Sequence, residues 1–146
     1  MIGSLFCSLG KAFGGCNIAQ SKDIPSPRDI IPQGDISYDS ELHTLTIKNI
    51  EPSIWLTSVA DTNSMDGLLD YGHTCILTNA FKYEDLAVGD VVVYWNGSQN
   101  IIHQIIKIKE DALGRVYTLK GINNASPDPY LIRDEHIQTL LLGIIF

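Results

Sequence analysis

The sequence has little positive charge: 10 Lys and Arg residues stand against 17 Asp and Glu among 146 residues, for a formal net charge of −7. Binding to a phosphate backbone requires a surplus of Lys and Arg on the protein surface. The charge balance therefore argues against a nucleic-acid partner. It does not argue against a protein or peptide substrate.

Long apolar runs are also missing. A membrane-spanning helix needs about 18 consecutive apolar residues, and the most apolar stretch, residues 139–146, has the length of a strand. Residues 1–15 are not typical of a secretory signal, because no Lys or Arg precedes their apolar part and Lys11 interrupts it. We therefore expect no transmembrane segment, and a chain that is soluble or peripherally associated with a membrane.

The three cysteines, Cys7, Cys16 and Cys75, are an odd number and include no CxxC pair. This pattern favours neither a disulfide framework nor a zinc site, and His73 with Cys75 supplies only two metal ligands. We expect no cofactor, no metal and a reducing, intracellular environment. Cys16 has an alternative: the Phe-Gly-Gly that precedes it is similar to a lipoprotein cleavage box, so a lipid anchor competes with a free thiol.

What the sequence does contain is a folding composition, with 45% hydrophobic and 18% charged residues. Residues 1–15 predict a short amphipathic helix, because their apolar side chains recur at helical spacing: Ile2, Leu5, Phe6, Leu9 and Phe13. Such a short helix must pack on something: its own domain, another subunit or a membrane surface. With Lys11 as the one basic residue, we favour a protein assembly contact through residues 1–15.

Residues 16–40 are polar and rich in turn residues, which is typical of a linker. After them come short runs rich in Val, Ile, Thr and Tyr that predict seven strands, at 42–50, 53–60, 74–79, 90–95, 101–109, 115–119 and 139–146. Only residues 64–71 and 133–138 suggest short helices. We expect residues 1–36 to form a helix and linker, and residues 37–146 to form a single mainly-β domain with one or two short helices.

Ser64 follows a predicted strand and begins the first of these short helices. A serine at that point exposes its hydroxyl and lies beside free backbone N–H groups, which are able to hold an oxyanion. Serine is also a preferred helix N-cap, which is a purely structural explanation.

His103 lies within Ile101-Ile102-His103-Gln104-Ile105-Ile106, so its strand is predicted to be buried on both faces. Taken alone, a histidine there is most simply a core residue. A neutral imidazole is nevertheless able to take a proton from a serine hydroxyl within hydrogen-bond reach. The other three histidines, His43, His73 and His136, occur in polar contexts typical of a surface.

The order of several motifs resembles the signal peptidase / LexA superfamily of serine endopeptidases. Residues 64–73 are similar to its nucleophile block, S-M-E-P-x-L-x-x-G-D, and residues 87–94 to x-V-G-D-I-V-V-F. Residues 101–106 are similar to I-V-H-R-V-I, the general-base block of the endoplasmic-reticulum and archaeal signal peptidases; other branches carry a lysine there. Residues 119–128 resemble T-K-G-D-x-N-x-x-x-D, and Gly143 corresponds to a closing glycine.

The resemblance implies a signal-peptidase-like β domain that hydrolyses peptide bonds. Ser64 would be the nucleophile and His103 the general base, and Asp128 matches the acidic third member that orients the imidazole. The backbone N–H of Ser64 would contribute to the oxyanion hole, and Met65 would pack beneath the site.

The sequence departs from the family pattern at four positions: Gly67 replaces Pro, His73 replaces Asp, Gln104 replaces Arg, and Ile122 replaces an Asp. The last change leaves Asp128 as the only acid available to orient His103, and a Ser-Pro-Asp-Pro turn also explains an aspartate there without catalysis. We also expect no membrane-spanning anchor, which the family's signal peptidases have.

Two functions therefore stay open. The first is a Ser/His or Ser/His/Asp endopeptidase. The second is a catalytically weak or inactive interaction and assembly module that keeps the peptidase fold, as in a structural protein of a phage or mobile element. The distance between the Ser64 hydroxyl and the His103 ring is the observation that best separates them.

Overall fold

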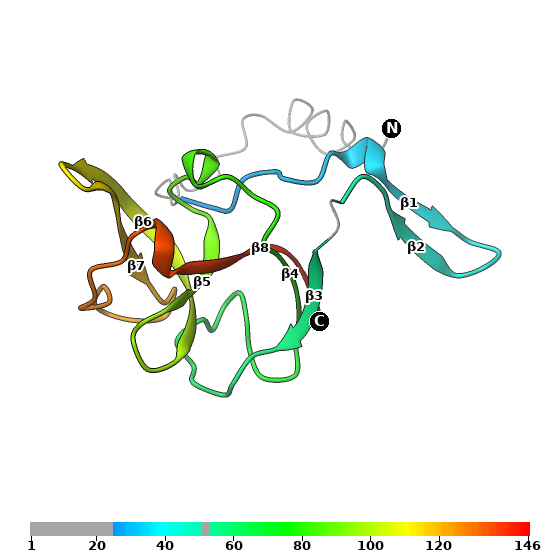
Figure 1. Ribbon diagram of the computed structural model, residues 1–146. Helices are drawn as coiled ribbons and strands as arrows, with labels where there is room; N and C mark the ends of the chain where they lie inside the picture. The colour runs from blue at the N-terminus through cyan, green and yellow to red at the C-terminus, as the bar shows by residue number, and fades with distance from the viewer. Residues whose placement is uncertain (1–24, 51–52) are drawn as a thin grey trace, which may run out of the picture.

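A six-stranded antiparallel sheet dominates the computed structural model, which describes residues 25–50 and 53–146 (Figure 1). Its strand order is β3-β4-β8-β5-β6-β7. The bounds are β3 (Ile54–Ser58), β4 (Thr74–Thr78), β5 (Val91–Trp95), β6 (Asn100–Asp111), β7 (Gly114–Lys120) and β8 (Ile137–Ile145). The mainly-β prediction is confirmed.

A separate two-stranded hairpin of β1 (Ile36–Asp39) and β2 (Thr44–Ile47) precedes the sheet and extends away from it in Figure 1. In the described part of the chain, the other regular elements are three short 3₁₀ turns: η2 (Gln33–Asp35), η3 (Tyr83–Asp85) and η4 (Asp134–His136). Over the described ranges, no helix has the length and apolar character to cross a membrane. The helix expected at residues 1–15, with Cys7 and Cys16, lies outside the described residues.

The predicted strands agree with β2 to β8, and the structure differs from the sequence predictions at three places. β1 forms in what we expected to be linker. Residues 64–68 form turns instead of a helix. The N–H groups of Leu68 and Leu69 both donate to the Met65 carbonyl, but Gly67 between them has a φ of 94°, which lies outside helical geometry. The predicted helix at 133–138 is only the single turn η4.

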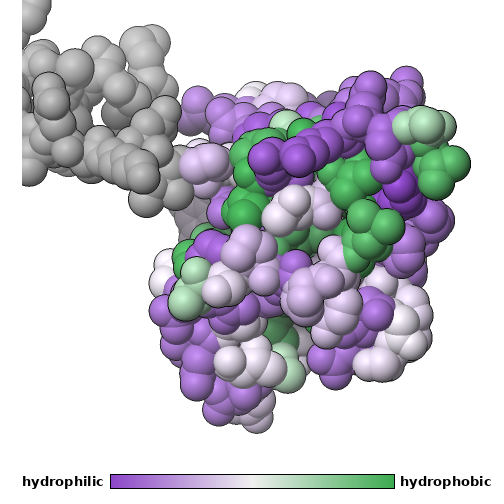
Figure 2. Space-filling view, turned by 90° about the vertical axis from the view of Figure 1, so that its left-hand side faces the viewer, coloured by the Kyte–Doolittle hydropathy of each residue, from purple (hydrophilic) through white to green (hydrophobic). Residues whose placement is uncertain are grey.

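The core lies on both faces of the sheet, because successive side chains of a strand point to opposite faces. Val92 and Tyr94 of β5 enter one cluster, together with Leu86, Ile105, Tyr117, Leu119, Ile132, Ile137 and Leu140. Val91 enters the other, together with Met65, Leu69, Cys75, Leu77 and Leu141. Figure 2 shows hydrophobic residues exposed among hydrophilic ones on the face at the left of Figure 1.

Part of the expected linker packs on the sheet. The Gln104 side chain donates hydrogen bonds to the carbonyls of Pro25 (3.1 Å) and Gly89 (3.0 Å). Arg28 donates to the carboxylate of Asp90, which is 1% exposed. Gln104 and Asp90, which both lie in the family-like blocks, therefore hold the segment that precedes the hairpin.

Candidate active site

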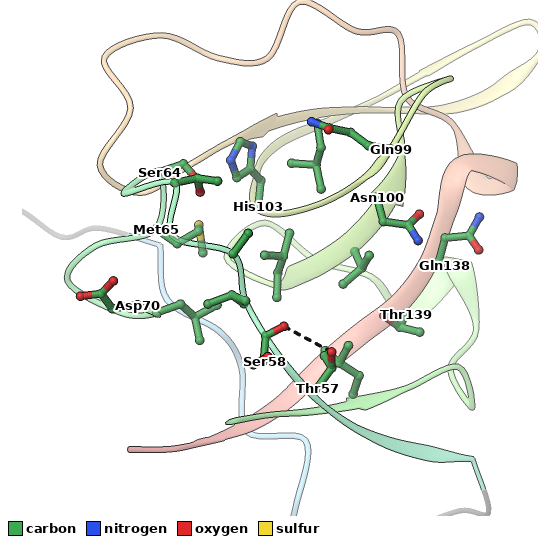
Figure 3. A pocket seen from close by; sticks show the side chains of 18 of the residues that line it. Thr57, Ser58, Ser64, Met65, Asp70, Gln99, Asn100, His103, Gln138 and Thr139 are labelled. Carbon is green, nitrogen blue, oxygen red and sulfur yellow. Dashed lines mark hydrogen bonds between the residues drawn. The ribbon is translucent and has the colours of Figure 1, made fainter. Parts of the chain in front are cut away.

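A cavity of about 840 Å³ opens between the end of β3, the loop that follows it, the start of β6 and the start of β8. Ser64 and His103 both line it, and Figure 3 shows the imidazole of His103 beside Ser64 at one end. Val59, Ala60, Leu77, Val93 and Ile102 supply much of its apolar wall. Its size is that of a typical small-ligand or side-chain pocket.

The Ser64 turn is clamped to a second turn, which follows β7. The backbone N–H of Asn123 donates to the Ser64 carbonyl (3.0 Å), and the Asn123 side chain donates to the Asn63 carbonyl (3.0 Å). Gly121 makes this approach possible, because a Cβ added there would lie 2.5 Å from the Ser64 carbonyl oxygen. Gly121 and Asn123 thus position the turn that carries Ser64.

The Ser64 hydroxyl shares a hydrogen bond with Thr62 Oγ1 (3.2 Å). Among the described residues it makes no hydrogen bond with His103, although both side chains line one cavity. Catalytic hydrogen bonds are often long or unmade without substrate. The backbone N–H of Ser64 donates to no backbone group among the described residues.

His103 is joined to Asp128. The distance from His103 Nδ1 to Asp128 Oδ2 is 2.6 Å, and the two side chains are only 7% and 10% exposed. An ionised carboxylate only accepts hydrogen bonds, so the tautomer that fits this contact is the one in which Nδ1–H donates to Asp128. The backbone N–H of Asp128 donates to the Leu119 carbonyl (2.9 Å), which ties the aspartate turn to the end of β7.

Tyr94 completes this group, and the sequence analysis did not identify it. Its hydroxyl donates to the same Oδ2 of Asp128 (2.8 Å), and the side chain is fully buried. Burial and the hydrogen bond to Asp128 raise the pKa of Tyr94 well above its usual value. The signal in the sequence was a tyrosine where the family-like block at residues 87–94 ends in phenylalanine.

The remaining histidines do not line the cavity. His43 is paired with Tyr38 on the exposed hairpin, His73 accepts the backbone N–H of Asp70, and His136 accepts that of Arg133. Ile122, at the position of the family's other acid, is 38% exposed and also lies outside the cavity lining.

Met65 is 4% exposed in the core cluster under the site, and it also borders the cavity. The next residue, Asp66, lines the cavity as well, and its Oδ1 is buried without a hydrogen-bond partner among the described residues. A buried acceptor of this kind is costly unless a donor reaches it. A bound ligand is one source of such a donor.

Comparisons with protein-family models, with curated proteins and with solved structures give no match to this chain. The cavity brings together a serine hydroxyl, an imidazole and a carboxylate bonded to that imidazole, which are the groups needed for acyl transfer.

Proposed function

We propose that this chain is a serine endopeptidase in which Ser64 is the nucleophile, His103 the general base and Asp128 the residue that orients the imidazole. The observation that carries the proposal is the 2.6 Å contact between His103 and Asp128 in the cavity that Ser64 also lines. A backbone carbonyl would satisfy the hydrogen-bonding need of a buried histidine that has no catalytic role. A buried carboxylate does more, because its negative charge also stabilises the imidazolium that forms when the general base takes a proton.

In the first step, the Ser64 hydroxyl leaves Thr62, turns toward His103 and attacks the carbonyl carbon of the scissile bond. The hydroxyl proton passes to His103 Nε2, and Asp128 stabilises the resulting imidazolium. The backbone N–H of Ser64 donates to the oxyanion. His103 then gives the proton to the leaving amine, and water, activated by the same imidazole, hydrolyses the acyl-enzyme.

The proposed substrate is an extended peptide. β3 is an edge strand that pairs only with β4 within the described residues, and its last residues, Thr57 and Ser58, line the cavity. An extended peptide is able to add to such an edge through backbone hydrogen bonds. The apolar wall of the cavity, which includes Val59 and Ala60, favours small apolar side chains next to the scissile bond.

The test is peptide cleavage by the purified full chain, followed by mass spectrometry, on a peptide set with small apolar residues before the scissile bond. We expect cleavage by the wild type and by Ser98→Ala, a matched change at an exposed serine outside the cavity lining. Ser64→Ala should abolish cleavage. Equal activity of the wild type and Ser64→Ala, or no cleavage of any peptide, contradicts the proposal.

The second candidate is an assembly module that keeps the fold without the chemistry. Two observations favour it: the Ser64 hydroxyl shares a hydrogen bond with Thr62, and among the described residues the β1–β2 hairpin exposes one apolar face. The register pairs Ile36 with Ile47 and Tyr38 with Leu45, so these four side chains share that face, and Tyr38 and Leu45 are 63% and 61% exposed. An isolated hairpin is marginal in water, and a partner that covers this face would stabilise it.

A further inference from the structure

We propose that Tyr94 is a positioning residue: its buried hydroxyl fixes the carboxylate of Asp128 and thereby the ring of His103. The proposal rests on the peptidase function argued above, since it assigns a role in that mechanism. Whether Tyr94 orders the His103–Asp128 pair is tested separately, by a measurement that does not depend on peptide cleavage.

The strand register brings Tyr94 to the histidine–aspartate pair. On the paired strands β5 and β6, Val92 lies opposite His103 and Tyr94 lies opposite Ile101. Residues two apart on a strand share a face, so the side chains of Tyr94 and His103 project from the same side of the sheet. Their ring centroids are 6.5 Å apart, and Asp128 Oδ2 lies within hydrogen-bond distance of both.

Tyr94 is a rigid support because it is part of the core. Its ring is fully buried in the cluster that contains Leu86, Ile105 and Leu140. A close-packed core leaves an aromatic ring little freedom to shift, and a buried tyrosine hydroxyl needs a hydrogen-bond partner. Within the described residues Asp128 is that partner, so the phenol remains neutral and donates.

Asp128 needs such a support because it comes from a turn. Its backbone is tied to the sheet by its own N–H, bonded to Leu119, but this bond leaves the carboxylate free to rotate about its side-chain torsions. Two donors on one oxygen, Tyr94 Oη–H and His103 Nδ1–H, remove that freedom. Within the described residues Asp128 is the one carboxylate bonded to His103, and Tyr94 holds that carboxylate in place.

The experiment compares two conservative changes in the full chain. Tyr94→Phe keeps the ring and deletes the donor. Tyr117→Phe is the matched control, because Tyr117 is also buried and also donates to an aspartate, Asp134, outside the cavity lining. Each change removes one buried tyrosine–aspartate hydrogen bond, so the two should cost similar amounts of stability.

The readout that separates positioning from stability is the proton NMR resonance of His103 Nδ1–H, assigned by its loss in His103→Gln. We expect this far-downfield resonance in the wild type and in Tyr117→Phe, and its broadening or loss in Tyr94→Phe. For peptide cleavage, we expect Tyr94→Phe to lower kcat at least 10-fold with KM changed less than 2-fold, and Tyr117→Phe to leave both unchanged. A resonance and a kcat that stay at wild-type values in Tyr94→Phe overturn the proposal.

A measurement on the wild type keeps the proposal testable if Tyr94→Phe does not fold. The Tyr94 hydroxyl proton should exchange slowly with solvent and show a nuclear Overhauser contact to His103 Nδ1–H; a rapidly exchanging hydroxyl without that contact overturns the proposal. The two proposals fail separately. If the wild type cleaves no peptide but Tyr94→Phe loses the His103 resonance, the peptidase proposal fails and the positioning role of Tyr94 is retained.

Discussion

His103 Nδ1 and Asp128 Oδ2 lie 2.6 Å apart although 25 positions separate the two residues in the chain. The hairpin of β6 and β7 accounts for the distance: the chain leaves His103 on β6, turns at its tip and returns on β7, and the Asp128 backbone then bonds to Leu119. Sheet pairing therefore brings the acid to the ring, and the aspartate turn supplies the last step. Four predictions follow from this and from the contacts around it.

Asp128→Asn should lower kcat for peptide cleavage by about 10²- to 10⁴-fold, as loss of the orienting acid does in Ser/His/Asp peptidases. The asparagine still accepts the Tyr94 hydroxyl through its carbonyl oxygen, so the fold should be retained. The measurement is steady-state cleavage with the thermal unfolding midpoint determined in parallel. Asp134→Asn, which alters the partner of Tyr117, is the control, and a kcat reduced equally by both changes would contradict the assignment.

Gly121→Ala should displace the Ser64 turn, because the new Cβ would lie 2.5 Å from the Ser64 carbonyl oxygen and 2.7 Å from the Asn124 side chain. Overpacking of this kind costs about 1–3 kcal/mol. We expect a lower free energy of unfolding in urea and at least a 10-fold loss of kcat/KM. Gly34→Ala, where a Cβ would meet nothing within 4 Å, should leave both at their wild-type values.

Arg28→Met should destabilise the fold by about 2–4 kcal/mol, because it leaves the carboxylate of Asp90 buried without its cation. Urea unfolding measures the loss. Arg133→Met is the comparison, since the Arg133 partner, Asp111, is exposed and exposed ion pairs contribute little. The double change Arg28→Met with Asp90→Asn should recover part of the loss; no recovery would mean that Arg28 acts through packing alone.

The stability of the fold should fall at alkaline pH with a slope set by two buried tyrosines. Burial and aspartate partners raise the pKa of both Tyr94 and Tyr117 above the ordinary value of 10.0. Below about pH 10 the phenols are neutral in the folded and unfolded chain, and this contribution is fully present; above pH 10 only the unfolded chain loses the protons, so folding weakens as pH rises.

Urea unfolding at a series of pH values from 8 to 11.5 measures that slope. It should be shallower in Tyr94→Phe and in Tyr117→Phe, and shallowest in the double variant. Tyr71→Phe, at a tyrosine that is 71% exposed, is the control. An alkaline slope that is the same in all of these variants would show that the two buried phenols do not cause it.

The strands were largely predictable because their signal is local. Alternating or continuous Val, Ile and Tyr marked β5 and β6, and turn residues marked their ends. β1 was missed because its four residues, Ile36–Asp39, include only two apolar side chains and are flanked by turn residues. The short helix predicted at residues 64–71 does not form, because Gly67 has a left-handed φ of 94° there.

By itself, the sequence determined the mainly-β fold and named Ser64, His103 and Asp128 as candidates, since hydrophobic period and motif order are properties of the chain alone. Tertiary structure alone decided which groups meet. It joined His103 to Asp128, added Tyr94 from the neighbouring strand, and left the Ser64 hydroxyl on Thr62. The scarcity of Lys and Arg led us to expect no nucleic-acid partner, but charge counts carry no distances. Hydrogen bonds over a few ångströms depend on strand register and core packing, which only the folded chain has.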